Sequence, residues 1–165
     1  MLDVIGEETL NNYLNSYLYD NGFDAVCVMD TDFWVDLSCN IIHYSIFADE
    51  EEITETYMEE ISKDFPELAC ADDAMLAFFH EIGHIETEDE WTEEEWEACV
   101  KWKEQDCASH REYFRYPTEW RATEWACNYI LAHKNEVLNF WEGFIELLTE
   151  FYIINKEQLT CNISI

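Results

Sequence analysis

The sequence predicts an α+β protein that is mainly helical and contains one small sheet of two or three strands. Most of the chain places apolar residues at helical spacing, and only residues 25–47 are rich in β-branched and aromatic residues. The 165 residues are 48% hydrophobic and 16% aromatic, which suits a folded domain with a continuous core and excludes a disordered chain. Because no repeat, low-complexity linker or domain boundary interrupts the pattern, we expect residues 1–165 to form a single domain.

The first third of the chain changes from helical to strand-like spacing. Residues 7–20 carry apolar side chains on one helical face, and Asn21-Gly22 is a typical helix end. The strand-like runs that follow are residues 25–29, 34–37 and 41–47. His43 lies in the last run, where we expect it to be a half-buried packing residue.

The rest of the chain is predicted to be helical, with boundaries set by capping residues and prolines. Asp72 is a suitable N-cap, Thr92 and Glu95 have the spacing of a capping box, and Pro117 fits the first turn of a helix. The predicted helices are residues 49–62, 72–86, 92–108, 117–133 and 136–154. Residues 110–117 are expected to form a loop.

The third predicted helix contains the motif H-E-x-x-H, as His80-Glu81-Ile82-Gly83-His84. Two histidines four residues apart project from the same face of a helix, and their imidazole nitrogens are suitable ligands for Zn²⁺. The glutamate beside the first histidine is positioned to act as a general base in hydrolysis. We therefore predict His80 and His84 as metal ligands and Glu81 as the catalytic residue.

A catalytic zinc site normally has three protein ligands, so one more must come from elsewhere in the chain. Glu119, Ala122 and Ala126 are spaced i, i+3 and i+7 and therefore share one helical face. The small alanines allow this helix to approach the helix of the motif closely, which favours Glu119 as the third metal ligand. Glu124 lies about 140° around the helix from Glu119, so we expect it to face elsewhere and to pair with Arg121.

The two motifs together resemble the ImmA/IrrE-type zinc metallopeptidases, which are gluzincin-like enzymes of bacteria, phages and mobile elements. H-E-I-G-H matches their first signature, and Glu119 with Ala122, Trp125 and Ala126 matches the second, approximately E-x-E-A-x-x-F-A. The resemblance covers about residues 34–132. It implies a zincin-like domain whose small sheet packs on the H-E-x-x-H helix, with bound Zn²⁺. It also implies hydrolysis of a peptide bond in a specific protein, such as a repressor or a host defence component.

The chain departs from the family pattern in the region between the motifs. Arg121 stands where the second signature has an acid, and the 34 residues between His84 and Glu119 include the acidic segment 86–97. Peptide hydrolysis also requires a donor that stabilises the oxyanion. The residues considered for this role are Tyr113, Tyr116, His110 and His133.

The net charge of −30 comes from 38 acidic and 8 basic residues. Coulomb repulsion makes direct binding to nucleic acid or to an anionic membrane unfavourable, whereas a basic or DNA-binding protein is a suitable partner. Solubility alone also explains such a charge. A second functional hypothesis is therefore an acidic inhibitor that mimics DNA, binds a nucleic-acid-binding protein without cleaving it, and retains zinc only for its structure.

The seven cysteines and the first residues of the chain indicate the subcellular compartment in which we expect the protein. An odd number of cysteines without a C-x-x-C pair indicates reduced thiols that are mostly buried. The chain has no apolar run of about 18 residues, and its first residues lack the basic and apolar regions of a signal peptide. We therefore expect a cytoplasmic protein.

Overall fold

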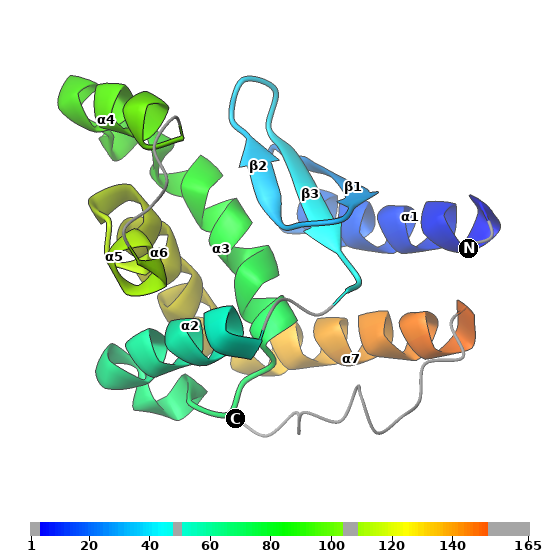
Figure 1. The fold of residues 1–165 in the computed structure, drawn as a ribbon. Helices are drawn as coiled ribbons and strands as arrows, with labels where there is room; N and C mark the ends of the chain where they lie inside the picture. The colour runs from blue at the N-terminus through cyan, green and yellow to red at the C-terminus, as the bar shows by residue number, and fades with distance from the viewer. Residues whose placement is uncertain (1–3, 48–50, 104–108, 152–165) are drawn as a thin grey trace.

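The computed structural model describes residues 4–47, 51–103 and 109–151 and has the expected mainly helical α+β architecture (Figure 1). Its strands are β1 (Val26–Asp30), β2 (Trp34–Asp36) and β3 (Ile41–Ser45). Its α-helices are α1 (Val4–Asp20), α2 (Glu51–Asp64), α3 (Asp73–Thr87), α4 (Glu93–Lys103), α5 (His110–Phe114), α6 (Pro117–Ala132) and α7 (Lys134–Phe151). Two short 3-10 helices, η1 (Pro66–Leu68) and η2 (Glu88–Glu90), precede α3 and α4. The expected continuations of α4 to residue 108 and of α7 to residue 154 lie outside the described residues.

The helix starts follow the capping signals of the sequence. The Asp72 side chain accepts a hydrogen bond from the backbone N–H of Met75, and Pro117 occupies the first turn of α6. Thr92 and Glu95 form the expected capping box, since the side chain of each accepts a hydrogen bond from the backbone N–H of the other. The loop expected at residues 110–117 is wrong, because Ser109 accepts from the backbone N–H of Glu112 and starts the short helix α5.

The three strands form a mixed sheet with β3 in the centre. β3 pairs in parallel with β1, in the register Val26↔Ile41, and antiparallel with β2. On the outer side of β1, the Asn15 side chain of α1 accepts a hydrogen bond from the backbone N–H of Cys27 at 2.6 Å and donates one to its carbonyl oxygen at 3.2 Å. The Asn15 amide therefore satisfies the N–H and the C=O of Cys27, the two groups with which an adjacent strand would pair at this residue.

The H-E-x-x-H helix α3 occupies the middle of the molecule, between the sheet and α6 (Figure 1). It contacts β2 and β3 on one side, as the resemblance implied, and makes the most extensive helix–helix contact of the described residues with α6 on the other. α1 packs on β1 and on α7. Among the described residues, no helix combines the length and the apolar character needed to cross a bilayer.

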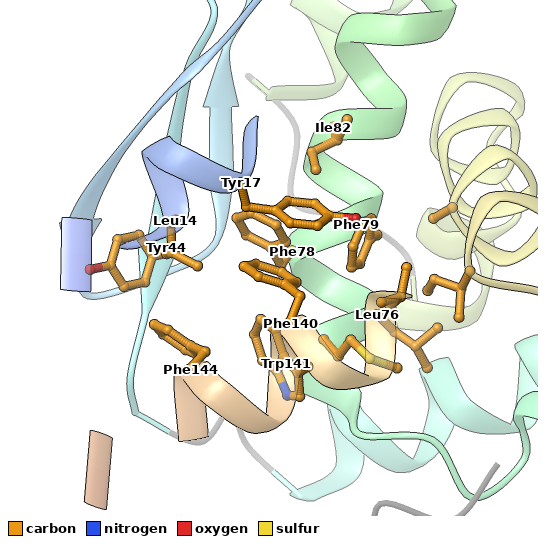
Figure 2. Close-up of a cluster of buried hydrophobic side chains, with 14 of the residues drawn as sticks. Leu14, Tyr17, Tyr44, Leu76, Phe78, Phe79, Ile82, Phe140, Trp141 and Phe144 are labelled. Carbon is orange, nitrogen blue, oxygen red and sulfur yellow. The ribbon is translucent and has the colours of Figure 1, made fainter. Parts of the chain in front are cut away.

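The core between α1, α3 and α7 is mainly aromatic (Figure 2). The Phe140 ring stacks on Tyr17 with 3.7 Å between ring centroids and also contacts Phe78 and Phe79 of α3 at 5.9 and 6.3 Å. Aromatic pairs of this kind contribute about 0.5–1.5 kcal/mol each beyond the area that they bury. This cluster packs on one face of α3, and α6 packs on the opposite face.

The exposure of His43 and of four cysteines tests the expectations for these residues. His43 is half-buried, as expected, and its ring stacks on Trp34 with 3.6 Å between centroids. Cys27 and Cys127 are buried free thiols, and burial raises the pKa of Cys127 to about 12. Cys39 and Cys70 are free but exposed, so the expectation of mostly buried thiols holds for only two of the four described cysteines.

A buried carboxylate joins α2 to α5. The Glu60 side chain is only 3% exposed and pairs with Lys63, with Arg111 at 3.3 Å and with Arg115 at 2.6 Å. Burial opposes ionisation of Glu60, but Lys63 and Arg115 outweigh it and hold the pKa of this carboxyl below its ordinary value. Arg115 also pairs with Asp64 at 2.7 Å. This network fixes α5 just before α6 begins.

α3 and α6 approach each other most closely where Gly83 faces Ala122. A Cβ atom on Gly83 would overlap the carbonyl oxygen of Ala122 and lie 3.0 Å from the Ala122 carbonyl carbon and Cα. Because these are backbone atoms of a packed helix, no side-chain rotation can make room for the Cβ. Glycine at position 83 is therefore required for the observed separation of the two helices.

Gly83→Ala is expected to destabilise the protein by about 1–3 kcal/mol, because the added methyl group forces the helices apart. The sign of the change in unfolding free energy is diagnostic, because replacing glycine by alanine inside a helix ordinarily stabilises the helix by about 1 kcal/mol. Chemical denaturation measures the change. Gly6→Ala in α1 is the matched control, because the three atoms nearest to its Cβ, at 3.3–3.4 Å, belong to the side chain of Phe151, which is 38% exposed. Equal stability of Gly83→Ala and the wild type would contradict the close contact.

Candidate metal centre

The crossing of α3 and α6 brings His80, His84 and Glu119 together. The Oε2 atom of Glu119 lies 3.1 Å from Nε2 of His80 and 3.3 Å from Nε2 of His84. One possible ligand atom from each residue lies within 4.8 Å of the other two. The structure thus places the two histidines of the first motif and the glutamate of the second around a single point, on the face that the sequence pattern indicated.

The three side chains are largely removed from solvent, since those of His80, His84 and Glu119 are 10%, 8% and 13% exposed. Burial opposes ionisation of Glu119, but the charge of His84 and the hydrogen bonds of both histidines outweigh it, so the pKa of Glu119 lies well below its ordinary value. Glu119 is therefore an ionised carboxylate, as a metal ligand must be.

Thr123 supports one of the two histidines from behind. Its hydroxyl oxygen lies 2.9 Å from Nδ1 of His80, and its side chain is buried. When Nδ1–H donates to this hydroxyl, the lone pair of His80 is on Nε2 and faces Glu119. Thr123 lies four residues after Glu119 and so on the same helical face, a spacing from which the sequence could have suggested it.

The donor set fits a divalent transition metal. Two imidazole nitrogens and one carboxylate are the protein ligands of one common class of catalytic zinc site. Tetrahedral ligand atoms at zinc bonding distances lie about 3.4 Å apart, close to the observed separations of 3.1 and 3.3 Å. Nδ1 of His84, the ring nitrogen that does not contact Glu119, is buried and has no hydrogen-bond partner among the described residues. The convergence of the three donor atoms is the feature of the triad that suits an ion.

Glu81 and Tyr57 are two further buried residues of interest, one next to His80 in sequence and one in contact with its ring. Glu81 follows His80 in α3 and is 7% exposed. Tyr57 of α2 is 8% exposed, and its ring meets that of His80 edge to face with 6.1 Å between centroids. Burial is the main cause that raises the pKa of Tyr57, and the carboxylates of Glu81 and Glu119 add to it. Tyr57 lies within the predicted helix 49–62, and no local signal in the sequence linked it to the triad.

The four residues considered as oxyanion donors differ in exposure and in their position relative to the triad. His110 and His133 are exposed. His133 follows the end of α6, about 21 Å along the helix from Glu119 at 1.5 Å per residue, so it is too far away to act at the triad. Tyr113 and Tyr116 are half-buried, and Tyr116 is the N-cap of α6, one turn before Glu119. A role of Tyr113 or Tyr116 as the oxyanion donor stays a prediction.

The expected pairing of Glu124 with Arg121 is wrong. Glu124 is exposed and faces away from the triad, as the helical spacing indicated. Arg121 instead contacts Glu95 at 2.9 Å and Glu90 at 3.6 Å. The helical spacing between Arg121 and Glu124 allowed a local pair, but the arginine bonds to a carboxylate 26 residues away that is itself mostly buried.

Comparisons with protein-family models, with curated proteins and with solved structures find no match to this chain. The geometry of the triad is therefore the observation from which a function can be argued.

We expect the purified protein to bind about one Zn²⁺ per chain, and we expect Glu119→Ala to weaken zinc binding by at least about 100-fold, because it removes one of three ligands. Glu124→Ala is the matched control in the same helix and should change the affinity little. Competition with a chromophoric chelator measures both. Unchanged zinc content after replacing both His80 and His84 by alanine would locate the metal elsewhere.

Thr123→Val is expected to weaken zinc binding by about 10- to 100-fold, the usual effect of removing a hydrogen bond to a ligand histidine. The substitution keeps the shape of the side chain and removes its hydroxyl. Thr123→Ser retains the hydroxyl and should restore the affinity. If valine and serine bind zinc equally well, the contact with Nδ1 of His80 does not orient the ligand. Circular dichroism checks that each variant keeps its helical content.

Proposed function

We propose that this protein is a zinc-dependent metallopeptidase that hydrolyses a peptide bond in a specific protein substrate. The observation that carries the proposal is the convergence of Nε2 of His80, Nε2 of His84 and Oε2 of Glu119; Glu81, the residue after His80, is buried as well. Three protein ligands of this kind together with a neighbouring glutamate form the usual centre of metal-assisted hydrolysis. The resemblance of the two motifs to the ImmA/IrrE-type metallopeptidases supports the same function.

The fit of the donor set assigns His80, His84 and Glu119 as the residues that would hold the ion. Bound there, Zn²⁺ supplies Lewis acidity that polarises a carbonyl group and lowers the pKa of water. The Thr123 hydroxyl orients the His80 ring, and it can accept from Nδ1–H when Nε2 holds the ion. The side chains of these three ligand residues are at most 13% exposed, so little bulk water reaches them. This burial strengthens electrostatic interactions at the site.

Glu81 performs the proton transfers of the proposed reaction. Its carboxylate accepts a proton from the attacking water, whose oxygen bonds to the carbonyl carbon of the scissile peptide. The carbon–nitrogen bond then breaks, and Glu81 returns the proton to the leaving amine. The products are a new carboxyl terminus and a new amino terminus, so that one water is consumed for each bond cleaved.

Glu81→Gln is expected to keep the fold and the zinc but to lower hydrolysis by about 10²- to 10⁴-fold, the usual contribution of a general acid–base residue. The assay is mass spectrometry of new termini in a proteome-derived peptide mixture incubated with zinc-loaded protein. Glu86→Gln is the matched control, because Glu86 lies in the same helix but is exposed. Its activity should equal that of the wild type.

The acidic-inhibitor hypothesis predicts the opposite behaviour of Glu81→Gln. Charge mimicry does not depend on a general base, so an inhibitor would keep its full effect and bind a nucleic-acid-binding protein more weakly as salt rises. A pull-down from a bacterial lysate with wild type and Glu81→Gln distinguishes the two. Intact, equally bound targets in both samples would reject the peptidase.

A further inference from the structure

Tyr57 of α2 carries a buried hydroxyl that has no hydrogen-bond partner among the described residues. The residue as a whole is 8% exposed. A buried hydroxyl that stays unpaired lowers the stability of the folded state, and native proteins rarely retain such a group. Packing alone would be served better by phenylalanine, which has the same ring without the hydroxyl. The Tyr57 hydroxyl therefore requires an explanation beyond packing.

The neighbours of Tyr57 place its hydroxyl beside Thr123. The Tyr57 ring meets that of His80 edge to face with 6.1 Å between centroids and packs on Phe114 of α5 at 4.9 Å. Burial is the largest cause that raises the pKa of Tyr57, and a hydrogen-bond interaction with the Thr123 side chain acts against it. The two hydroxyls are therefore neighbours, although in this structure they lack full hydrogen-bond geometry. A small rotation of either side chain would complete the bond.

The contact between Thr123 and His80 allows two hydrogen-bond directions. A threonine hydroxyl can accept from Nδ1–H or donate to Nδ1, and both directions fit the distance of 2.9 Å. Only the first direction leaves the lone pair on Nε2, the atom that lies 3.1 Å from Oε2 of Glu119. In the second direction Nε2 carries the hydrogen, donates it to Glu119 and has no lone pair for a metal. The metal-binding form of His80 therefore depends on where the Thr123 hydroxyl hydrogen points.

We propose that Tyr57 is a positioning residue of the metal centre, whose hydroxyl oxygen accepts the Thr123 hydroxyl hydrogen and so turns the lone pairs of Thr123 toward Nδ1–H of His80. The inference rests on the metal centre of the proposed function and adds to it the residue that selects the metal-binding form of a ligand. Donation by Thr123 also makes its oxygen a stronger acceptor, because hydrogen bonds in a chain polarise one another. Tyr57 acts only through Thr123.

Tyr57→Phe tests the role of the hydroxyl, because it keeps the ring contacts with His80 and Phe114. We expect zinc affinity, measured by competition with a chromophoric chelator, to fall by about tenfold, as for other residues behind a metal ligand. Stability in denaturant with excess chelator should be unchanged or higher, since the substitution removes an unpaired buried hydroxyl. A purely structural role would not separate these two quantities. Zinc affinity equal to that of the wild type would overturn the inference.

Tyr44→Phe is the matched control. Tyr44 of β3 is also buried, but its hydroxyl donates to Oδ1 of Asn11 at 2.8 Å. Removing this hydroxyl should lower stability, because Asn11 loses a partner, and should leave zinc affinity unchanged. An equal loss of zinc affinity in Tyr44→Phe and Tyr57→Phe would assign the effect to the loss of any buried hydroxyl and would overturn the inference.

A double-mutant cycle tests whether Tyr57 acts through Thr123. Thr123→Val removes the hydroxyl that Tyr57 is proposed to orient, so Tyr57→Phe should have no further effect on zinc affinity in that background. Additive losses in the double variant would show that the two residues act independently, which contradicts the proposed chain of hydrogen bonds.

NMR of the His80 ring gives a signature that packing alone would not change. Long-range proton–nitrogen correlations distinguish the ring with hydrogen on Nδ1 from the ring with hydrogen on Nε2. Before zinc is added, Tyr57→Phe should shift the population from Nδ1–H toward Nε2–H. The loss of zinc affinity should match the fall in the Nδ1–H fraction, because only that form is competent to bind. Equal populations in Tyr57→Phe and the wild type would overturn the inference.

These measurements separate failure of this inference from failure of the proposed function. If the wild type binds zinc but hydrolyses nothing, and Tyr57→Phe weakens zinc binding through Thr123, the positioning role is supported and the peptidase is rejected. If the wild type hydrolyses peptides and Tyr57→Phe binds zinc equally well, the positioning role alone is rejected. A wild type that binds no zinc at the triad rejects both.

Discussion

The triad of the candidate metal centre depends on the close contact between Gly83 of α3 and the backbone of Ala122 of α6. Helices with larger side chains at their interface usually lie 8–10 Å apart, and small residues permit a shorter approach. That approach brings Glu119 to the two histidines and Thr123 behind His80. The missing side chain at position 83 therefore determines a distance that the proposed chemistry requires, since a displacement of about 1 Å can cost a catalytic site much of its rate.

The same contact buries polar groups that contribute little to folding by themselves. Removing two imidazoles and a carboxylate from water is unfavourable unless hydrogen-bond or charge partners compensate. Within the triad these three groups serve chiefly as one another's partners. A bound ion would satisfy all three ligands at once, and its binding free energy would add to the stability of the folded state. The aromatic core around Phe140, which contains no such groups, supports α3 from the opposite side.

The parts of the structure that follow local rules could be predicted, and the parts that depend on long-range contacts could not. The Asp72 cap, the Thr92 capping box and the i, i+3, i+7 spacing after Glu119 each act within two turns of a helix. The helix α5 also had a local signal in Ser109, although the sequence analysis assigned a loop there. By contrast, the choice of Glu95 by Arg121 and the contact of Tyr57 with His80 depend on how whole helices pack, which no nearby residue encodes.

The amide of Asn15 has a consequence for the behaviour of the protein at high concentration. An open strand edge is a template on which a second molecule can extend the sheet, and such pairing leads to aggregation. At the β1 edge, the hydrogen-bonding groups of Cys27 are already taken. β2 offers an edge of three residues, and a chain with a net charge of −30 repels its own copies. The sheet beside the candidate metal centre thus has little opportunity to extend from one molecule to the next.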